Sequence, residues 1–217
     1  MRRTLGLTLA LLSPGALAAQ ETDEATFLLR HGRDEIGRES YRVLEGRGRG
    51  QPGATLAVTA EYPARHPALS VTALVSRSPE GALTAFQLER AAPGDTTRIL
   101  GEVAGGRLTL RIVRGATEAA RQLPAGGDLV ILADSLHTLL GQVGPMATEA
   151  GRRLTGLYPE SGRRIALTAT LAQPGASGGR VVEVTGDVVA RLTYDGAGRL
   201  VRVSAPASGV AAVRAEF

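Results

Sequence analysis

The residues best suited to acid–base chemistry in this sequence are three histidines, and His137 has the most suggestive neighbours. It follows Asp134 and Ser135, so one short segment holds the residue types of a Ser-His-Asp triad. A triad needs a specific spatial geometry that neighbours in sequence rarely provide, and this segment offers no strand–turn–helix elbow to expose a nucleophilic serine. We therefore expect Asp134 to cap a helix and His137 to face solvent. A hydrolase of unknown substrate that uses His137 or His31 is kept as an alternative.

A metal site is the chemistry that His31 could serve, because Asp34 and Glu35 follow it closely. Zinc sites combine several imidazole or thiolate ligands at recognisable spacings, whereas this segment offers a single imidazole. The chain has no cysteine, His66 has no partner nearby in sequence, and the carboxylates are dispersed. The sequence therefore predicts no metal site, no cofactor and no catalytic constellation, so we do not expect an enzyme.

Arginine supplies all of the positive side-chain charge, because the chain contains no lysine. The segment from Gly46 to Gly50 alternates glycine with arginine, but a true phosphate loop carries a lysine and leads into a helix. The arginines are scattered, whereas a nucleic-acid footprint would cluster them, so no nucleic-acid partner is predicted. The pairs Arg152-Arg153 and Arg163-Arg164 could form a small basic patch. We favour a second interpretation, in which they are charges that discourage pairing of strand edges.

The elements that must position any site are strands, because apolar and polar residues alternate along most of the chain. Alternation with a period of two is typical of half-buried antiparallel strands. Turn residues such as Pro79-Glu80-Gly81 and Asp195-Gly196 separate the alternating runs. The spacing predicts about ten to twelve strands, joined mainly as hairpins. The clearest runs are Leu56–Tyr62, Leu69–Val75, Leu108–Ile112, Ile165–Leu171 and Val182–Val188.

One segment departs from the alternation and predicts a short helix. Leu129–Leu132 is an apolar run, Asp134 can cap the helix that follows, and Gly144-Pro145 can end it. Because a sheet with one apolar face must cover that face, we expect a single strongly curved antiparallel sheet, a half-barrel, with this helix packed in its concavity. Four residues at helical spacing are expected to line the concavity as a gate or plug and to contact a ligand: Leu136, Leu139, Leu140 and Val143.

The N-terminal segment has the pattern of a cleavable secretory signal peptide. Arg2 and Arg3 precede an apolar run, and Ala16-Leu17-Ala18 offers small residues for cleavage. The apolar run is shorter than the roughly 20 residues that span a bilayer. We therefore expect removal of residues 1–18, which lowers the formal net charge from +4 to +2. Residues 19–217 should form a single β-rich domain that is exported to the periplasm or secreted.

This layout resembles the half-barrel superfamily of bacterial periplasmic proteins that includes the outer-membrane lipoprotein carriers and many uncharacterised secreted domains. The resemblance lies in a first hairpin with Gly32–Gly37, in the apolar run and capped helix of Leu129–Val143, and in a last hairpin with Tyr194–Leu200. It implies a curved antiparallel sheet with helices in its mouth, and a hydrophobic ligand of unspecified kind. The chain has fewer aromatic residues than the carriers.

The predicted function is binding of an apolar or amphiphilic molecule, such as a lipid, or of an envelope partner protein, in the concavity. A small outer-membrane β-barrel is kept as an alternative, because Phe217 is the last residue of an alternating strand. Such a barrel also needs strands of about ten residues and two aromatic girdles. Four tyrosines and three phenylalanines cannot furnish those girdles.

Overall fold

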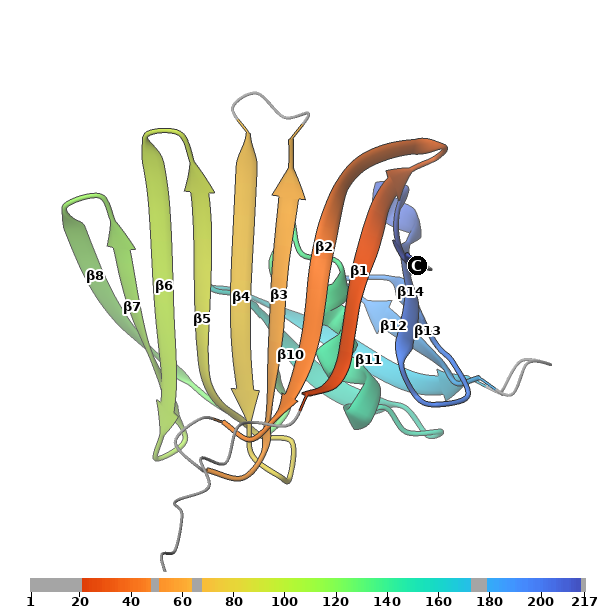
Figure 1. The fold of residues 1–217 in the computed structure, drawn as a ribbon. Helices are drawn as coiled ribbons and strands as arrows, with labels where there is room; N and C mark the ends of the chain where they lie inside the picture. Colours follow the sequence, from red (N-terminus) through yellow and green to blue (C-terminus); the bar gives the residue numbers. More distant parts are fainter. Residues whose placement is uncertain (1–20, 48–50, 64–67, 173–178, 216–217) are drawn as a thin grey trace, which may run out of the picture.

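The computed structural model describes residues 21–47, 51–63, 68–172 and 179–215 (Figure 1). The predicted signal peptide of residues 1–18 lies outside the described residues, as do His66 and Phe217. Strands form where apolar and polar residues alternate, because alternation buries one face of a strand and leaves the other to solvent. In chain order the elements are β1 (Glu21–His31), β2 (Asp34–Glu45), β3 (Ala54–Tyr62), β4 (Leu69–Arg77), β5 (Leu83–Ala92), β6 (Asp95–Ala104), β7 (Arg107–Arg114), β8 (Thr117–Pro124), β9 (Leu129–Ile131), the 3-10 helix η1 (Thr138–Met146), β10 (Arg152–Tyr158), β11 (Arg163–Ala172), β12 (Val181–Gly186), β13 (Ala190–Tyr194), β14 (Leu200–Ala205), the 3-10 helix η2 (Pro206–Ser208) and β15 (Val210–Arg214).

All of these strands belong to one 15-stranded sheet, whose two edges are β8 and β9. Strands β1 to β8 form one antiparallel meander, and β10 to β15 form another. The two meanders join where β1 pairs with β15, so the first and last strands meet in the middle of the sheet. The sheet is open, because β8 and β9 do not pair with each other in the part of the chain that the structure describes.

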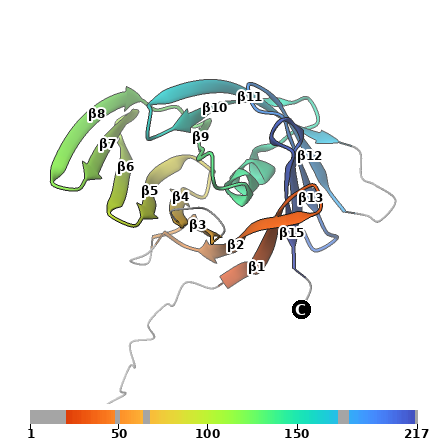
Figure 2. The same ribbon diagram turned by 90° about the horizontal axis from the view of Figure 1, so that it is seen from above.

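The sheet curls around η1, which lies inside the curve when the molecule is seen from above (Figure 2). The inner faces of both meanders supply the hydrophobic core, from Phe27 on β1 through Leu88 on β5 to Leu192 on β13. η1 adds Leu139 and Val143 to the same cluster. The expected fold class is therefore confirmed: a mainly β protein built from one strongly curved, open sheet around a short helix.

The structure corrects three details of that expectation. The sheet has 15 strands rather than the smaller number expected, in part because β8 is exposed along nearly its whole length and carries no apolar alternation. β9 pairs parallel with β10, so the sheet is not wholly antiparallel. η1 is a 3-10 helix that begins at Thr138 and contains Pro145, and the exposed Asp134 does not cap it. Glycine and proline in this segment disfavour a regular α-helix.

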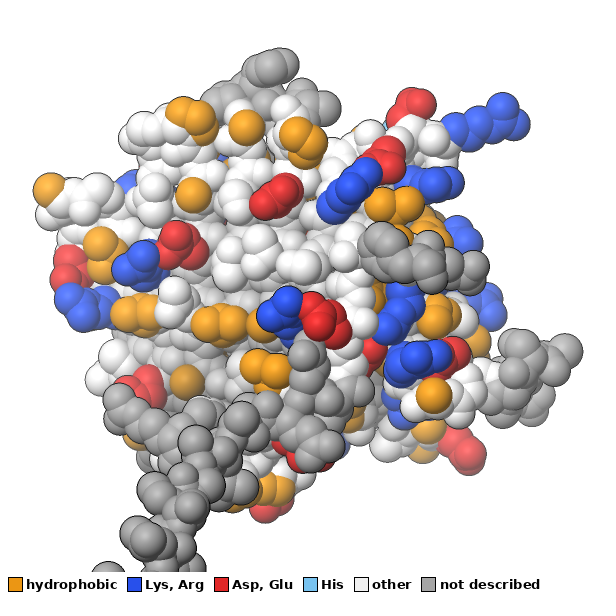
Figure 3. Space-filling view, viewed as in Figure 1, with side chains coloured by type: hydrophobic (Ala, Val, Ile, Leu, Met, Phe, Trp, Pro, Cys, Tyr) orange, Lys and Arg blue, Asp and Glu red, His pale blue; other side chains and the backbone are white. Residues whose placement is uncertain are grey.

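The outer face of the sheet carries polar and charged side chains with hydrophobic ones scattered among them (Figure 3). Thr59 and Thr72 on neighbouring strands share a hydrogen bond of 3.2 Å. Arg111 and Glu118 form a two-bonded ion pair on the exposed β7–β8 hairpin. Exposed ion pairs contribute at most about 1 kcal/mol each. The stability of the fold therefore rests on the inner face of the sheet and on η1.

Among the described helices, none has the length and apolar character needed to cross a membrane.

Candidate ligand-binding site

A buried carboxylate from the sheet holds the N-terminus of η1. Glu39 lies on the inner face of β2, and none of its surface is exposed. Its Oε1 accepts a hydrogen bond of 2.7 Å from the backbone N–H of His137. Its Oε2 accepts hydrogen bonds from the backbone N–H and the hydroxyl of Thr138, at 2.7 and 2.5 Å. Glu39 therefore takes the capping role that the sequence assigned to Asp134, because the free N–H groups at a helix start need acceptors.

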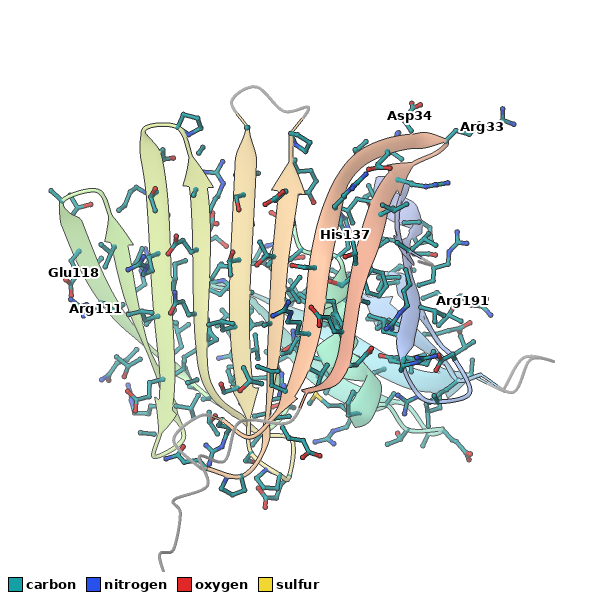
Figure 4. All side chains as sticks on the ribbon, viewed as in Figure 1. Arg33, Asp34, Arg111, Glu118, His137 and Arg191 are labelled. Atoms are coloured by element: carbon teal, nitrogen blue, oxygen red, sulfur yellow. The ribbon has the colours of Figure 1, made fainter. Side chains whose placement is uncertain are left out.

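Burial and hydrogen bonding act in opposite directions on the protonation of Glu39. Removal from water raises the pKa of Glu39 and the hydrogen bonds from Thr138 and His137 lower it, and the net result is a rise from 4.5 to about 7. His137 is half-buried, whereas the sequence predicted that it would face solvent, and burial lowers its pKa. Figure 4 places His137 behind β1 and β2, away from Arg111 and Glu118 at the edge of the sheet. Glu39 is thus an interior acid that changes charge near neutral pH.

Gln142 ties the C-terminal half of η1 to two parts of the sheet. Its Nε2 donates to the carbonyls of Ile131 and Leu139, at 2.7 and 2.9 Å, and its Oε1 accepts from the Ile131 N–H at 3.2 Å. The same Oε1 accepts a hydrogen bond of 2.6 Å from Nη2 of Arg77, at the end of β4. The buried Nε–H of Arg77 has no acceptor among the described residues. One polar network therefore joins β4, β9 and η1.

Tyrosine rings from the sheet pack closely on the segment that contains η1. The Tyr62 hydroxyl donates to the Ser135 carbonyl at 2.8 Å, and the Tyr194 hydroxyl donates to the Gly141 carbonyl at 3.3 Å. A Cβ atom placed on Gly144 would lie 2.0 Å from the Tyr194 hydroxyl oxygen, closer than atoms can approach. Glycine at this position therefore lets η1 approach the sheet.

We expect Gly144→Ala to lower the free energy of unfolding by about 1–3 kcal/mol, because the added methyl group would displace the Tyr194 ring. Chemical unfolding followed by circular dichroism measures the change. Gly196→Ala is the matched control, since no atom lies within 4 Å of the Cβ that it would add. Equal stability of the two variants would contradict the close packing of η1 against Tyr194.

A pocket opens between the C-terminal half of η1 and the ends of β2, β3 and β4. We call it the lower pocket, because these strand ends lie at the bottom of Figure 1. Its volume is about 290 Å³, close to the lower limit of roughly 300–1,000 Å³ for small-molecule sites. Its apolar side chains come from the sheet and from η1. They include Tyr41, Val43, Ala54, Leu56, Val75, Pro145 and Met146.

Two arginines and one glutamate stand among the polar groups of the lower pocket. Arg77 is half-buried, and its pKa falls to about 10, mainly through burial and further through the nearby charge of Arg152. Arg152 is the exposed first residue of β10. Glu80 is exposed, and a hydrogen bond with Ser78 lowers its pKa, so it carries a negative charge at neutral pH. The three side chains together leave one net positive charge at the pocket.

A second pocket of about 440 Å³ opens at the other mouth of the half-barrel, and we call it the upper pocket. Buried Leu69, Val71 and Leu88 line it from β4 and β5. The turn between β10 and β11 forms another wall, where the Arg163 guanidinium stacks over the Tyr158 ring at 4.3 Å. Its charged side chains are of both signs: Arg90, Asp134, Glu160 and Arg163.

The four residues that the sequence assigned to a ligand contact lie in the hydrophobic core. Their relative exposures are at most 7%. They line neither the upper nor the lower pocket. η1 reaches the lower pocket through Gly141, Gln142, Pro145 and Met146. Their direct contact with a ligand therefore stays a prediction. The residues concerned are Leu136, Leu139, Leu140 and Val143.

The structure does not assemble a catalytic triad from Asp134, Ser135 and His137. The first two line the upper pocket, whereas His137 gives its backbone N–H to Glu39. Across the described ranges, no group of three or more His, Cys, Asp and Glu side chains could hold a metal ion. The arginine pairs also separate, because Arg152 and Arg163 lie at opposite ends of the β10–β11 hairpin.

Sequence reasoning missed the polar residues that anchor η1, although one of them carried a signal. Glu39 shares the core-facing side of its strand with Tyr41, so a charged residue occupies a position that the alternation assigns to the core. A carboxylate at such a position needs buried partners. Arg77 and Gln142 gave no comparable signal, because Arg77 stands at the end of a strand and Gln142 inside the helical segment.

These features define a class of protein: an open, barrel-like β domain whose curved sheet wraps around a short 3-10 helix. The chain is similar to a beta-barrel-like protein of the domain of unknown function DUF1849 from Brucella abortus, with a TM-score of 0.53 and 10% identity over 89% of this chain and 95% of that one. A DUF1089 family protein from Pseudomonas aeruginosa aligns with a TM-score of 0.40 and 13% identity, over 88% of this chain and 95% of that one. No family model and no curated protein matches the sequence. At this identity, the likeness to the Brucella protein shows the fold alone.

Proposed function

We propose that this protein is an exported binding protein that takes the apolar part of an amphiphilic molecule into the lower pocket. The observation that carries the proposal is an apolar cavity walled by the sheet on one side and by η1 on the other. Small-molecule sites combine apolar walls with a few polar groups that orient the ligand. Arg77, Gln142 and Arg152 are polar groups of that kind at this pocket.

The anchoring of η1 supports the proposal, because it makes the pocket a preformed one. Glu39 fixes the start of η1, and Gln142 fixes its middle. With a preformed wall, no mobile segment has to be ordered on binding, and the entropy cost of that ordering does not weaken binding. Export rests on the pattern of residues 1–18, and a role like that of the lipoprotein carriers rests on the sequence resemblance. Both belong to the proposal.

Filling the lower pocket should abolish binding. Ala54 begins β3 and lines the pocket, whereas Ala57, on the same strand and equally half-buried, points to the other face. We expect Ala54→Phe to weaken the binding of octanol, a neutral single-chain probe, by at least about tenfold, because the ring would occupy the space of the ligand. Titration calorimetry on the purified protein measures the dissociation constant.

The matched control is Ala57→Phe, which should bind octanol as the unaltered protein does. Circular dichroism should show that both variants keep the fold. If octanol binds Ala54→Phe and the unaltered protein equally well, or binds neither, the lower pocket is not the binding site that we propose.

A further inference from the structure

The charges of the lower pocket favour a ligand of one sign. Arg77 and Arg152 are close enough for the charge of Arg152 to lower the pKa of Arg77. Neither forms an ion pair with a carboxylate in the described part of the chain, whereas other arginines, such as Arg98 and Arg214, do. Two like charges held near each other at an apolar cavity repel one another, and an anion between them relieves the repulsion.

The Arg77 side chain adds a second reason to expect an anion. Its Nη1 and Nη2 atoms donate to carbonyl oxygens and to Gln142, but these acceptors are neutral. Its buried Nε–H has no acceptor among the described residues. A buried donor without an acceptor is unfavourable. Within the described ranges, the guanidinium therefore has neither a counter-charge nor an acceptor for its Nε–H.

The size of the pocket limits the apolar part of the ligand. A water-sized group occupies about 30 Å³, so a cavity of about 290 Å³ holds roughly ten such groups. Octanoate, with eight carbons and two oxygens, has this size. A lipid with several long acyl chains would not fit inside the cavity.

We infer that the ligand is a single-chain anionic amphiphile of about ten heavy atoms, such as a medium-chain carboxylate, and this inference rests on the proposed function. Its chain lies against Leu56, Val75 and Met146, and its anionic group meets the guanidiniums of Arg77 and Arg152. The upper pocket is the poorer site for an anion, because Asp134 and Glu160 balance its two arginines, whereas Glu80 is the one carboxylate beside the two arginines of the lower pocket.

Three probes with the same chain separate charge from hydrophobicity: octanoate, octanol and octylammonium. Titration calorimetry on the purified protein should show octanoate binding about tenfold more tightly than octanol, and octylammonium most weakly, because one charge-assisted hydrogen bond is worth about this factor. Raising the ionic strength should weaken the binding of octanoate and leave that of octanol unchanged.

Arg152→Gln should remove the preference for octanoate over octanol. Arg153→Gln is the matched control, because Arg153 is the next residue of β10 and is also exposed, but does not line the lower pocket. The control should keep the preference. If octanol binds as well as octanoate, the anionic head group is wrong although the proposed function stands. If Arg152→Gln keeps the preference and its salt dependence, the placement of the anionic group between Arg77 and Arg152 is wrong. If none of the three probes binds, the proposed function itself fails.

Discussion

Replacing Leu139 by aspartate should leave the protein unable to fold. Leu139 has no exposed surface and lies in the core cluster between the two meanders. A carboxylate at this point would be charged and without a partner, which costs several kcal/mol in addition to the lost apolar contacts. Because natural domains are stable by only about 5–15 kcal/mol, we expect little or no folded protein. Circular dichroism and resistance to proteolysis measure the outcome.

Two further variants make this experiment specific to the position. Leu139→Ala should fold but lose about 2–5 kcal/mol of stability, because it leaves a cavity without adding a charge. Leu74→Asp should be tolerated, since Leu74 is 38% exposed on the outer face of β4. A stable and soluble Leu139→Asp variant would show that η1 is not part of the core. The complete burial of Leu139 predicts that the aspartate variant loses folding rather than ligand uptake alone.

Replacing Glu39 by glutamine should remove a pH-dependent loss of stability near neutral pH. The pKa of Glu39 is about 7 in the folded protein, above its usual 4.5, because burial disfavours the charged form. A raised carboxyl pKa means that the folded state holds its proton more tightly than the unfolded state does. The stabilising effect of that proton is therefore full at pH values below 4.5 and is lost as the pH rises to about 7.

The size of this loss of stability follows from the rise in the pKa of Glu39. One pKa unit corresponds to about 1.4 kcal/mol, so the unaltered protein should lose roughly 3 kcal/mol relative to Glu39→Gln between pH 4.5 and pH 8. His137 acts in the opposite direction, because its lowered pKa makes the fold less stable as the pH falls through its usual value. Because the unaltered protein and Glu39→Gln both contain His137, its contribution cancels when their unfolding free energies are subtracted.

Glu35→Gln is the control for the Glu39 experiment. Glu35 lies on the same strand and is exposed, paired with Arg38 at the surface. Its replacement should leave the pH dependence as it is in the unaltered protein. A Glu39→Gln variant with the same pH dependence as the unaltered protein would show that Glu39 does not titrate in this range.

The sheet was largely predictable, because strand formation depends on a local pattern. The alternating runs Leu56–Tyr62 and Leu108–Ile112 lie within β3 and β7. β8 was missed because it faces solvent on both sides and thus has no apolar periodicity to read. The pairing of β1 with β15 could not be predicted, since nothing in either strand encodes a partner at the other end of the chain.

The binding site was less predictable than the sheet, because its residues meet only through the fold. Glu39 and Thr138 are 99 residues apart, and Arg77 and Gln142 are 65 apart. The helical spacing of Leu139 and Val143 correctly indicated a buried face, while their contact with a ligand stays a prediction. The pocket forms instead beside that face, at Gln142 and Met146.

The position of β1 beside β15 also has a consequence for the timing of folding. Each meander consists of neighbouring hairpins, which can form early because their contacts are local in sequence. The middle of the sheet cannot close until the last strand has been synthesised, when Arg214 reaches Asp23 and β15 meets β1. Until then the meander of β1 to β8 has two unpaired edges, each a template for pairing with another chain. The chain is therefore most prone to aggregation while β1 to β8 have formed and β15 has not yet paired with β1.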